Sequence, residues 1–246
     1  MRLDFTKMQG LGNDFVVVDG PIELTPADIV TLCDRRFGIG ADGVLVVTPG
    51  PPVLMDYRNA DGSAAEMCGN GLRCVARYAV DRGWAEPGEF IIETPIGPRR
   101  ARVGDGGVEV ELGEARITGQ TTGSGHDLVL VDVGNPHAVA FVDDPASVDL
   151  AATGPIIQSD FPDGINVEFA RLTDRGVDMR VWERGVGETL ACGTGMAAAV
   201  VASGASGGEP VQVRVPGGEA TVTISDGVAW IAGPADYSFT GSVAGR

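Results

Sequence analysis

The chain has 246 residues and a formal net charge of −16. This acidic charge disfavours partners such as nucleic acid and anionic membrane surfaces, and no apolar run approaches the roughly 20 residues that span a bilayer. Four cysteines without a secretory signal predict reduced thiols in a cytoplasmic protein, and with only two histidines to add, the chain is not expected to build a zinc cage.

The sequence predicts a mixed α/β (α+β) protein in which strands outnumber helices. Helices are expected at 26–37, where Thr25 is a good N-cap before a proline, and at 71–83 and 195–204. Many of the expected strands alternate apolar and polar residues, the pattern of a sheet with one buried face. They lie at 2–8, 14–19, 43–47, 54–58, 89–94, 101–103, 108–112, 127–133, 138–142, 165–172, 178–183, 211–215, 220–224 and 228–232. The glycine-rich stretch 119–127 is interpreted as the region of a domain junction.

The two halves of the chain repeat the same landmarks in the same order, about 124 residues apart. CGNG at 68–71 and CGTG at 192–195 each precede an apolar, helix-forming run, and Asn59 and Glu183 each lie nine residues before the cysteine. This period is far too long for a solenoid, so it predicts two similar domains. We place these domains at 1–116 and 117–235, each with one buried helix surrounded by strands.

The repeated motif puts Cys68 and Cys192 just ahead of two helix N-termini. The first N–H groups of a helix have no partner within it and, together with the helix dipole, form an anion site. The residues that offer such groups here are Gly69, Asn70 and Gly71 in one half and Gly193, Thr194 and Gly195 in the other. If the two N-termini converge, a substrate carboxylate lies between them and the α-carbon lies between the sulfurs. Two opposed thiols then suggest removal of a proton from one face of a carbon and its return from the other.

The same location is expected to tune the thiols. A free cysteine titrates near pH 8.5, and a helix N-terminus lowers that pKa by about one unit. This leaves the thiolate only partly populated at neutral pH, so His137 and Glu183 are candidates for proton-accepting neighbours. Cys33 and Cys74 lie on apolar helix faces and are interpreted as small buried hydrophobes.

Lysine usage argues against a pyridoxal-phosphate enzyme, which holds its cofactor on a lysine Schiff base. Lys7 is the only lysine, six residues from the first residue. The phosphate-loop pattern GxxxxGK[ST] is missing, and GLGNDF does not fit GxGxxG. We therefore expect no cofactor.

Six segments together resemble the diaminopimelate epimerase family: MQGLGNDF, RFGIGADG, NADGSAAEMCGNG, VGNPHAV, GINVEF and ERGVGETLACGTG. The resemblance covers nearly the whole chain. It implies a cofactor-independent epimerase that interconverts LL- and meso-2,6-diaminopimelate in lysine and peptidoglycan precursor biosynthesis. It implies two pseudo-symmetric domains, each a barrel-like, largely antiparallel sheet around a central helix. It also implies a homodimer, with the segment 236–246 returning to the first domain.

The resemblance also assigns roles to residues. Cys68 and Cys192 are the acid–base pair, and His137 and Glu183 assist them. The substrate-binding positions are Asn13, Asn59, Gly69, Asn70, Asn135, Asn166, Glu183, Arg184, Gly193 and Thr194. Two residues depart from the family pattern, because Gly43 stands where members carry Gln and Met196 stands where Ala is expected.

Three alternatives stay open. One is a two-thiol racemase of the same fold that acts on proline or hydroxyproline, which the ERGVGET and NPH segments disfavour. Another is a fold relative that isomerises through a carboxylate, which the two cysteines disfavour. The third is an inactive amino-acid-binding protein. A shared site further predicts that Cys68 and Cys192 oxidise to a disulfide.

Overall fold

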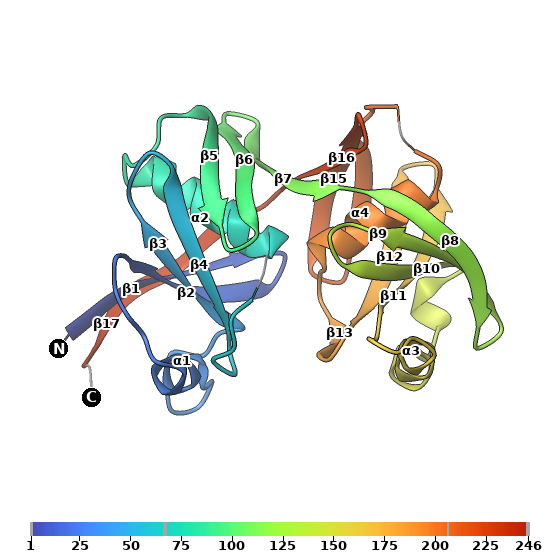
Figure 1. Ribbon diagram of the computed structural model, residues 1–246, viewed down its shortest axis with the longest axis horizontal. Coiled ribbons are helices and arrows are strands. Elements are labelled where there is room, and N and C mark those ends of the chain that lie inside the picture. Colours follow the sequence, from blue (N-terminus) through green and yellow to red (C-terminus); the bar gives the residue numbers. More distant parts are fainter. Residues whose placement is uncertain (1, 66–67, 206, 245–246) are drawn as a thin grey trace. The chain divides into compact units, whose positions relative to one another are not determined.

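The computed structural model describes residues 2–65, 68–205 and 207–244 (Figure 1). The chain forms two compact units: Met1–Val110 with Gly233–Arg246, and Glu111–Ala232. The boundaries expected from the sequence, 116/117 and 235/236, remain predictions beside these limits, and residues 245–246 of the expected returning segment lie outside the described residues. Within the described ranges, no helix has the length and apolar character needed to cross a bilayer.

In the first unit, a continuous row of strands follows the order β17-β1-β2-β3-β4-β5-β6-β7. Most neighbours are antiparallel, whereas β2/β3 and β4/β5 are parallel. The C-terminal strand β17 pairs with β1. The strands are β1 (Arg2–Gly10), β2 (Asn13–Asp19), β3 (Gly43–Thr48), β4 (Val53–Asn59), β5 (Gly88–Thr94), β6 (Gly97–Gly104), β7 (Gly107–Glu114) and β17 (Asp236–Ala244).

The second unit repeats this pattern with the order β8-β9-β10-β11-β12-β14-β15-β16. Here β10/β11 and β12/β14 are the parallel pairs, in the same places along the row as β2/β3 and β4/β5. The short β13 (Gly187–Thr189) also pairs with β12. The strands are β8 (Arg116–Gly123), β9 (His126–Asp132), β10 (Pro136–Phe141), β11 (Asn166–Thr173), β12 (Gly176–Glu183), β14 (Val211–Val215), β15 (Gly218–Ser225) and β16 (Val228–Gly233).

One helix is packed among the strands of each unit (Figure 1). Helix α2 (Gly69–Asp81) packs on β1 to β4 and β6, and helix α4 (Gly193–Ala202) packs on β8 to β12 and β15. Helix α4 is made of small apolar residues and is buried from Gly195 to Val200, which confirms the expectation of a helix enclosed on all sides. Met196 is fully buried within it. Both helices begin two residues earlier than predicted.

Two further helices lie outside this arrangement. Helix α1 (Pro26–Cys33) has Thr25 as its N-cap, as predicted, but it ends four residues early because the Asp34 carboxylate accepts from the N–H groups of Arg36 and Phe37. Helix α3 (Leu150–Ser159) was not predicted, because Gly154 and Pro155 lower its intrinsic helix propensity. A Cβ on Gly154 would lie 2.5 Å from the Trp182 ring, so packing requires glycine there. A short 3-10 helix, η1 (Pro145–Ser147), precedes α3.

The stretch 119–127 is not a domain junction, so this prediction is wrong. It belongs to the hairpin β8/β9, whose turn is formed by Ser124 and Gly125. The face of β8 is exposed and rich in Thr, Gln and Gly, so its composition looks like a linker although the backbone is extended. The limit between the units falls instead within β7.

Candidate active site

Cys68 and Cys192 are the N-cap residues of α2 and α4, which confirms their expected place at helix N-termini. The Cys68 sulfur accepts from the N–H of Gly71 at 3.4 Å, and the Cys192 sulfur accepts from the N–H of Gly195 at the same distance. Each sulfur therefore satisfies one of the N–H groups that a helix leaves without an internal partner. Each half of the chain carries a thiol at an anion-attracting position.

Around Cys68, the polar neighbours are amides. Its Sγ donates to Asn13 Oδ1 at 3.4 Å, and Asn70 Nδ2 donates to the same oxygen at 3.3 Å. Asn70 is buried and also accepts from Arg73, whose side chain is fully buried. Cys68 itself is half-buried. Glu66 and Met67, which precede it in the quoted motif, lie outside the described residues.

Asn59 lies at the end of β4, where its side chain donates to Ser63 Oγ at 3.0 Å. It is opposite Gly43 in the β3/β4 ladder. A Cβ on Gly43 would lie 2.5 Å from both the Arg58 carbonyl oxygen and the Tyr57 ring. The side chain that the family pattern carries at this position therefore does not fit here without a shift of β4.

Around Cys192, the polar neighbours include carboxylates. Burial raises the pKa of Cys192 well above its ordinary value, and the charges of Glu183 and Glu168 raise it further. Hydrogen bonds from the Thr194 hydroxyl and the Gly195 N–H oppose this rise but are outweighed. The expectation that the helix N-terminus lowers the thiol pKa is wrong for Cys192, because desolvation and two negative charges exceed the helix effect.

Glu183, at the end of β12, accepts from Thr189 Oγ1 at 2.5 Å. Burial raises the pKa of its carboxyl, and the neighbouring Glu168 charge acts in the same direction. Hydrogen bonds from Thr189 and from Cys192 act the other way. A carboxyl with a raised pKa that is hydrogen-bonded to a thiol is suited to exchange a proton with it.

His137 is fully buried on β10. Its Nδ1 lies 2.7 Å from Glu168 Oε1, and its Nε2 lies 2.9 Å from Asn135 Oδ1. Glu168, which is fully buried on β11 between apolar residues, is not among the predicted site residues. A glutamate inside a strand stretch that is otherwise apolar was the signal available. Glu168 also lies against α4, since a Cβ on Gly195 would be 2.6 Å from Glu168 Oε1.

Asn166 and Arg184 are joined through the backbone. Asn166 Nδ2 donates to the Pro136 carbonyl, and its Oδ1 accepts from the Arg184 N–H at 3.0 Å. The Arg184 side chain is exposed and donates to the Asp163 carbonyl at 3.2 Å. The second unit thus gathers eight of the predicted site residues around the starts of β10 and β11, the end of β12 and the start of α4: Asn135, His137, Asn166, Glu183, Arg184, Cys192, Gly193 and Thr194.

The other two cysteines are core residues. Cys33 and Cys74 are buried, and burial raises their pKa values to about 11 and about 12. Neither has the environment of a reactive thiol.

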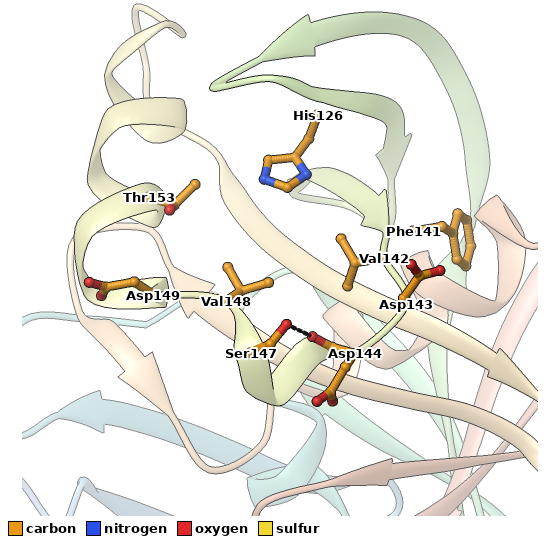
Figure 2. Close-up of a pocket in the computed structure, with 9 residues that line it drawn as sticks. All are labelled: His126, Phe141, Val142, Asp143, Asp144, Ser147, Val148, Asp149 and Thr153. Carbon is orange, nitrogen blue, oxygen red and sulfur yellow. Dashed lines mark hydrogen bonds between the residues drawn. The ribbon is translucent and has the colours of Figure 1, made fainter.

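A surface pocket of about 570 Å³ lies in the second unit (Figure 2). It is lined by His126, the segment 141–144 and the start of α3, and it contains three aspartates. None of the predicted site residues contributes to it. In the portion of the chain that the structure describes, no group of three or more His, Cys, Asp or Glu residues could hold a metal ion.

Comparison with known sequences shows which family the chain resembles. The family model described as "Diaminopimelate epimerase" matches residues 5–118 and 129–237. A diaminopimelate epimerase from Alkalilimnicola ehrlichii is 42% identical over 280 residues, covering 99% of each chain. One from Mycolicibacterium smegmatis is 42% identical over 94% of this chain and 93% of its own.

Solved structures share the fold. A phenazine biosynthesis protein of the PhzF family from Bacillus anthracis aligns with a TM-score of 0.76 and 16% identity over 99% of both chains. A hydroxyproline epimerase from Agrobacterium vitis aligns with a TM-score of 0.75 and 17% identity over 98% of this chain and 92% of its own. With the repeated strand order above, these similarities confirm the predicted fold class of two pseudo-symmetric α/β domains.

Proposed function

The chain belongs to the diaminopimelate epimerase family, and we propose that it interconverts LL- and meso-2,6-diaminopimelate by proton transfer between two cysteines. Cys68 takes the α-proton or returns it on one face of the carbon, and Cys192 does so on the other. The observation that carries this proposal is that both cysteines are helix N-cap residues. Each sulfur accepts a hydrogen bond from the N–H of the glycine three residues later in the chain. A racemising enzyme needs one base and one acid, and a repeated thiol supplies both.

The reacting carboxylate is proposed to bind at the helix N-termini, to the N–H groups of Gly69, Asn70, Gly193 and Thr194. Deprotonation of an α-carbon builds negative charge next to this carboxylate. Pre-organised N–H groups in a site that excludes water stabilise such charge without reorganising. No cofactor is required in this scheme, because helix N-termini take the role of the electron sink.

Glu183 and His137 are proposed to assist the thiols. Glu183 exchanges a proton with Cys192, which its raised pKa and its hydrogen bond to that thiol support. His137 is the second assisting group, held by Glu168 and Asn135. With one sulfur as thiolate and the other as thiol, the two exchange roles at each turnover.

Recognition of the distant end of the substrate is proposed to separate this enzyme from a general amino-acid racemase. Diaminopimelate carries a second ammonium and carboxylate, which pair with charged and amide side chains. Arg184 is exposed and its guanidinium contacts only a carbonyl among the described residues, so it can turn to a carboxylate. Asn13, Asn59, Asn135, Asn166 and Glu183 complete the proposed set.

The test is incubation of reduced protein with LL-diaminopimelate in D₂O without added cofactor, followed by NMR of the α-proton. We expect exchange of the proton together with appearance of the meso isomer. Absence of both under reducing conditions would reject the substrate assignment, and proline or hydroxyproline turnover would then favour the alternative racemase.

A second test addresses the thiol pair. The proposal requires both sulfurs to reach one α-carbon, so mild oxidation should join Cys68 and Cys192 in a disulfide and stop activity until reduction. Mass spectrometry that finds both thiols unmodified in oxidised, inactive protein contradicts this.

The family resemblance further supports a cytoplasmic homodimer that serves lysine and peptidoglycan precursor biosynthesis, and sedimentation of the purified protein tests the dimer.

A further inference from the structure

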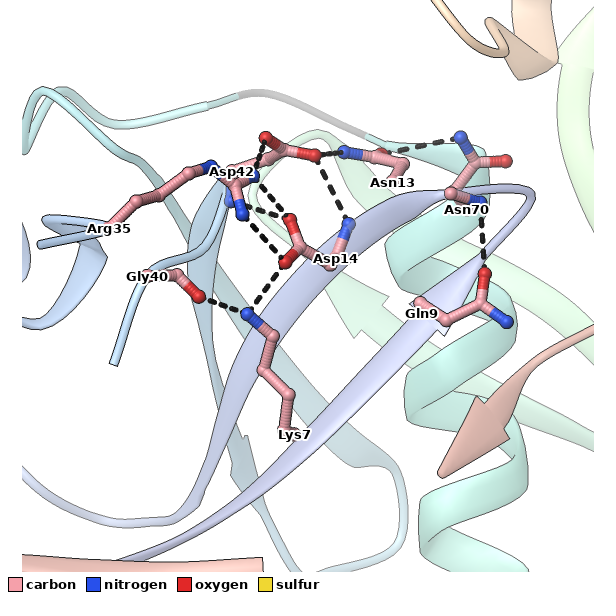
Figure 3. A network of polar contacts seen from close by, with 9 residues as sticks. Lys7, Gln9, Asn13, Asp14, Arg35, Gly40, Asp42 and Asn70 are labelled. Carbon is pink, nitrogen blue, oxygen red and sulfur yellow. Dashed lines mark hydrogen bonds and ion pairs between the residues drawn. The ribbon is translucent and has the colours of Figure 1, made fainter. Parts of the chain in front are cut away.

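A network of charged and amide side chains surrounds Asn13 in the first unit (Figure 3), and Asn13 in turn accepts a hydrogen bond from Cys68. The central carboxylate of this network belongs to Asp14, which pairs with Lys7 at 2.6 Å and with Arg35 at 2.7 Å. The Lys7 ammonium also donates to the Gly40 carbonyl. Arg35 then pairs with Asp42 Oδ1 at 2.7 Å. The residues that enclose Cys68 are therefore connected to a set of fixed charges.

Asp42 determines how the Asn13 amide is oriented. The other Asp42 oxygen, Oδ2, accepts from Asn13 Nδ2 at 2.7 Å and from the Asp14 N–H at 3.1 Å. An ion-paired carboxylate has no proton to donate, so only the nitrogen of the Asn13 amide can face it. The Asn13 oxygen is thereby turned towards Cys68, whose Sγ lies 3.4 Å away.

Arg73 fixes the neighbouring amide in the same manner. Its Nη2 donates to Asn70 Oδ1 at 2.8 Å within the buried region. A guanidinium has no acceptor, so the Asn70 oxygen must face it and the Asn70 nitrogen points to Asn13 Oδ1 at 3.3 Å. The two charged ends, Asp42 and Arg73, leave each amide only one arrangement.

We propose that Asp42 is a positioning residue that holds the Asn13 carbonyl oxygen against Cys68 and so favours the protonated thiol. An amide oxygen accepts a hydrogen bond from S–H, whereas it faces a thiolate as negative charge against negative dipole. The role of Cys68 as an acid rests on the proposed function above. The orientation of Asn13 and its effect on the Cys68 proton do not depend on the identity of the substrate.

The experiment is the pKa of Cys68, read from its ¹³Cβ chemical shift against pH in protein labelled at cysteine Cβ. In Asp42→Asn, residue 42 gains a donor and no longer requires the Asn13 nitrogen. The Asn13 amide can then turn its nitrogen to the sulfur and stabilise the thiolate, although this turn gives up the hydrogen bond that Asn13 Oδ1 accepts from Asn70. We expect the Cys68 pKa to fall by about one unit, or about tenfold more thiolate at a pH below it. The matched control is Asp56→Asn, which removes a carboxylate paired with Arg58 on β4 and should leave the pKa unchanged.

Loss of a negative charge alone also lowers a thiol pKa. The experiment is therefore extended to a double-mutant cycle that combines Asp42→Asn with Asn13→Ala. If Asp42 acts through Asn13, adding Asp42→Asn to Asn13→Ala produces no further fall. A full shift in the Asn13→Ala background overturns the proposal, because Asp42 would then act by its charge directly. An unchanged or raised Cys68 pKa in Asp42→Asn overturns it as well. These outcomes stand whether or not the protein turns over diaminopimelate.

A measurement on the unaltered protein covers the case in which Asp42→Asn fails to fold. Asn13 Nδ2 and the Asp14 N–H donate to the same oxygen, so their protons lie close together. We expect a nuclear Overhauser cross-peak between them, with the Asn13 amide assigned from its loss in Asn13→Ala. A cross-peak from the Asn13 amide protons to the Cys68 β-protons in its place shows the reverse orientation and contradicts the proposal.

Discussion

The helix N-termini that carry Cys68 and Cys192 are nearly alike in backbone and unlike in surroundings. Cys68 has φ −142° and ψ 114°, and Cys192 has φ −123° and ψ 115°. Both sulfurs accept from an N–H group at 3.4 Å. Yet Cys68 is half-buried and donates to a neutral amide oxygen, whereas Cys192 is buried beside Glu183 and Glu168.

The difference arises from the strands and loops that surround each helix. In the first unit, ionic pairs between Lys7, Asp14, Arg35 and Asp42 support the neighbouring amides. In the second unit, the support is a fully buried pair of His137 and Glu168. The repeat therefore reproduces the position of the sulfur at the helix N-terminus, whereas the burial and the polar neighbours of the sulfur differ between the two halves.

Removing either thiol is the strongest way to test whether the two halves act as a pair. Cys68→Ala and Cys192→Ala should each lower the rate of epimerisation by about 10²–10⁴-fold, because each deletes one partner in proton transfer. The measurement is appearance of the meso isomer from LL-diaminopimelate. Cys33→Ala, in the apolar cluster of the first unit, is the control and should retain most of the activity. A Cys192→Ala variant with a tenth of the normal rate would mean that one thiol suffices.

Arg184→Ala tests whether the second unit also carries the recognition of the distant end. We expect a loss of about 100-fold in kcat/KM for diaminopimelate, the scale of a lost charge-assisted hydrogen bond. Steady-state kinetics measure it, with Arg175→Ala, an exposed arginine of the same unit, as the control. A near-native rate in Arg184→Ala refutes its role in specificity.

Much of the fold could be predicted because the two halves of the sequence carry the same motifs in the same order. The repeat predicts two domains with a central helix, and the parallel pairs β2/β3 and β10/β11 follow the same order. The unpredicted elements lack local signals. Helix α3 contains Gly154 and Pro155, and β17 has an almost wholly exposed face whose place is decided by its pairing with β1. Tertiary contacts override the local preference in both cases.

The position of the two thiols in the candidate site could be predicted from the sequence, but the side chains that surround each thiol could not. The spacing of the motifs places both cysteines on helix N-termini, where the structure has them. The contact between Asp42 and Asn13 joins residues 29 apart in the sequence, and that between His137 and Glu168 joins residues 31 apart. Such pairs depend on strand register, which motif spacing does not contain. The raised Cys192 pKa likewise depends on burial and on two carboxylates from different strands.

The ionic support of the first unit predicts its own pH dependence. Burial opposes ionisation of Asp14, but Arg35 and Lys7 outweigh this and lower its pKa from 3.8 to about 2. A lowered folded-state pKa stabilises the protein above pH of about 4, and this contribution is lost as the pH falls through about 2. Asp14→Asn should therefore cost about 2 kcal/mol of unfolding free energy at pH 7 and much less at pH 2.

Urea unfolding of the two proteins at both pH values checks this, with Asp174→Asn as the control on an exposed turn of the second unit. An equal difference between Asp14→Asn and the unaltered protein at pH 7 and pH 2 would show that packing rather than charge carries the loss. Since Asp14 lies in the first unit, Asp174→Asn in the second unit should not change the pH dependence of the unfolding free energy.

The charge of Glu183 is the feature of the second unit with the smallest expected effect and the clearest sign. Burial is the main cause of the raised Cys192 pKa, and Glu183 is the largest charged cause. Glu183→Gln keeps the shape and removes the charge, so the Cys192 pKa should fall by about one unit. The ¹³Cβ shift of Cys192 against pH measures it, with Glu188→Gln, whose carboxylate pairs with Arg180, as the control. Because Glu183 is also proposed to exchange a proton with this thiol, the same variant should turn over more slowly although its thiol is more acidic. A more acidic Cys192 with an unchanged or faster rate would leave Glu183 only an electrostatic role and would make the two half-sites more alike than proposed.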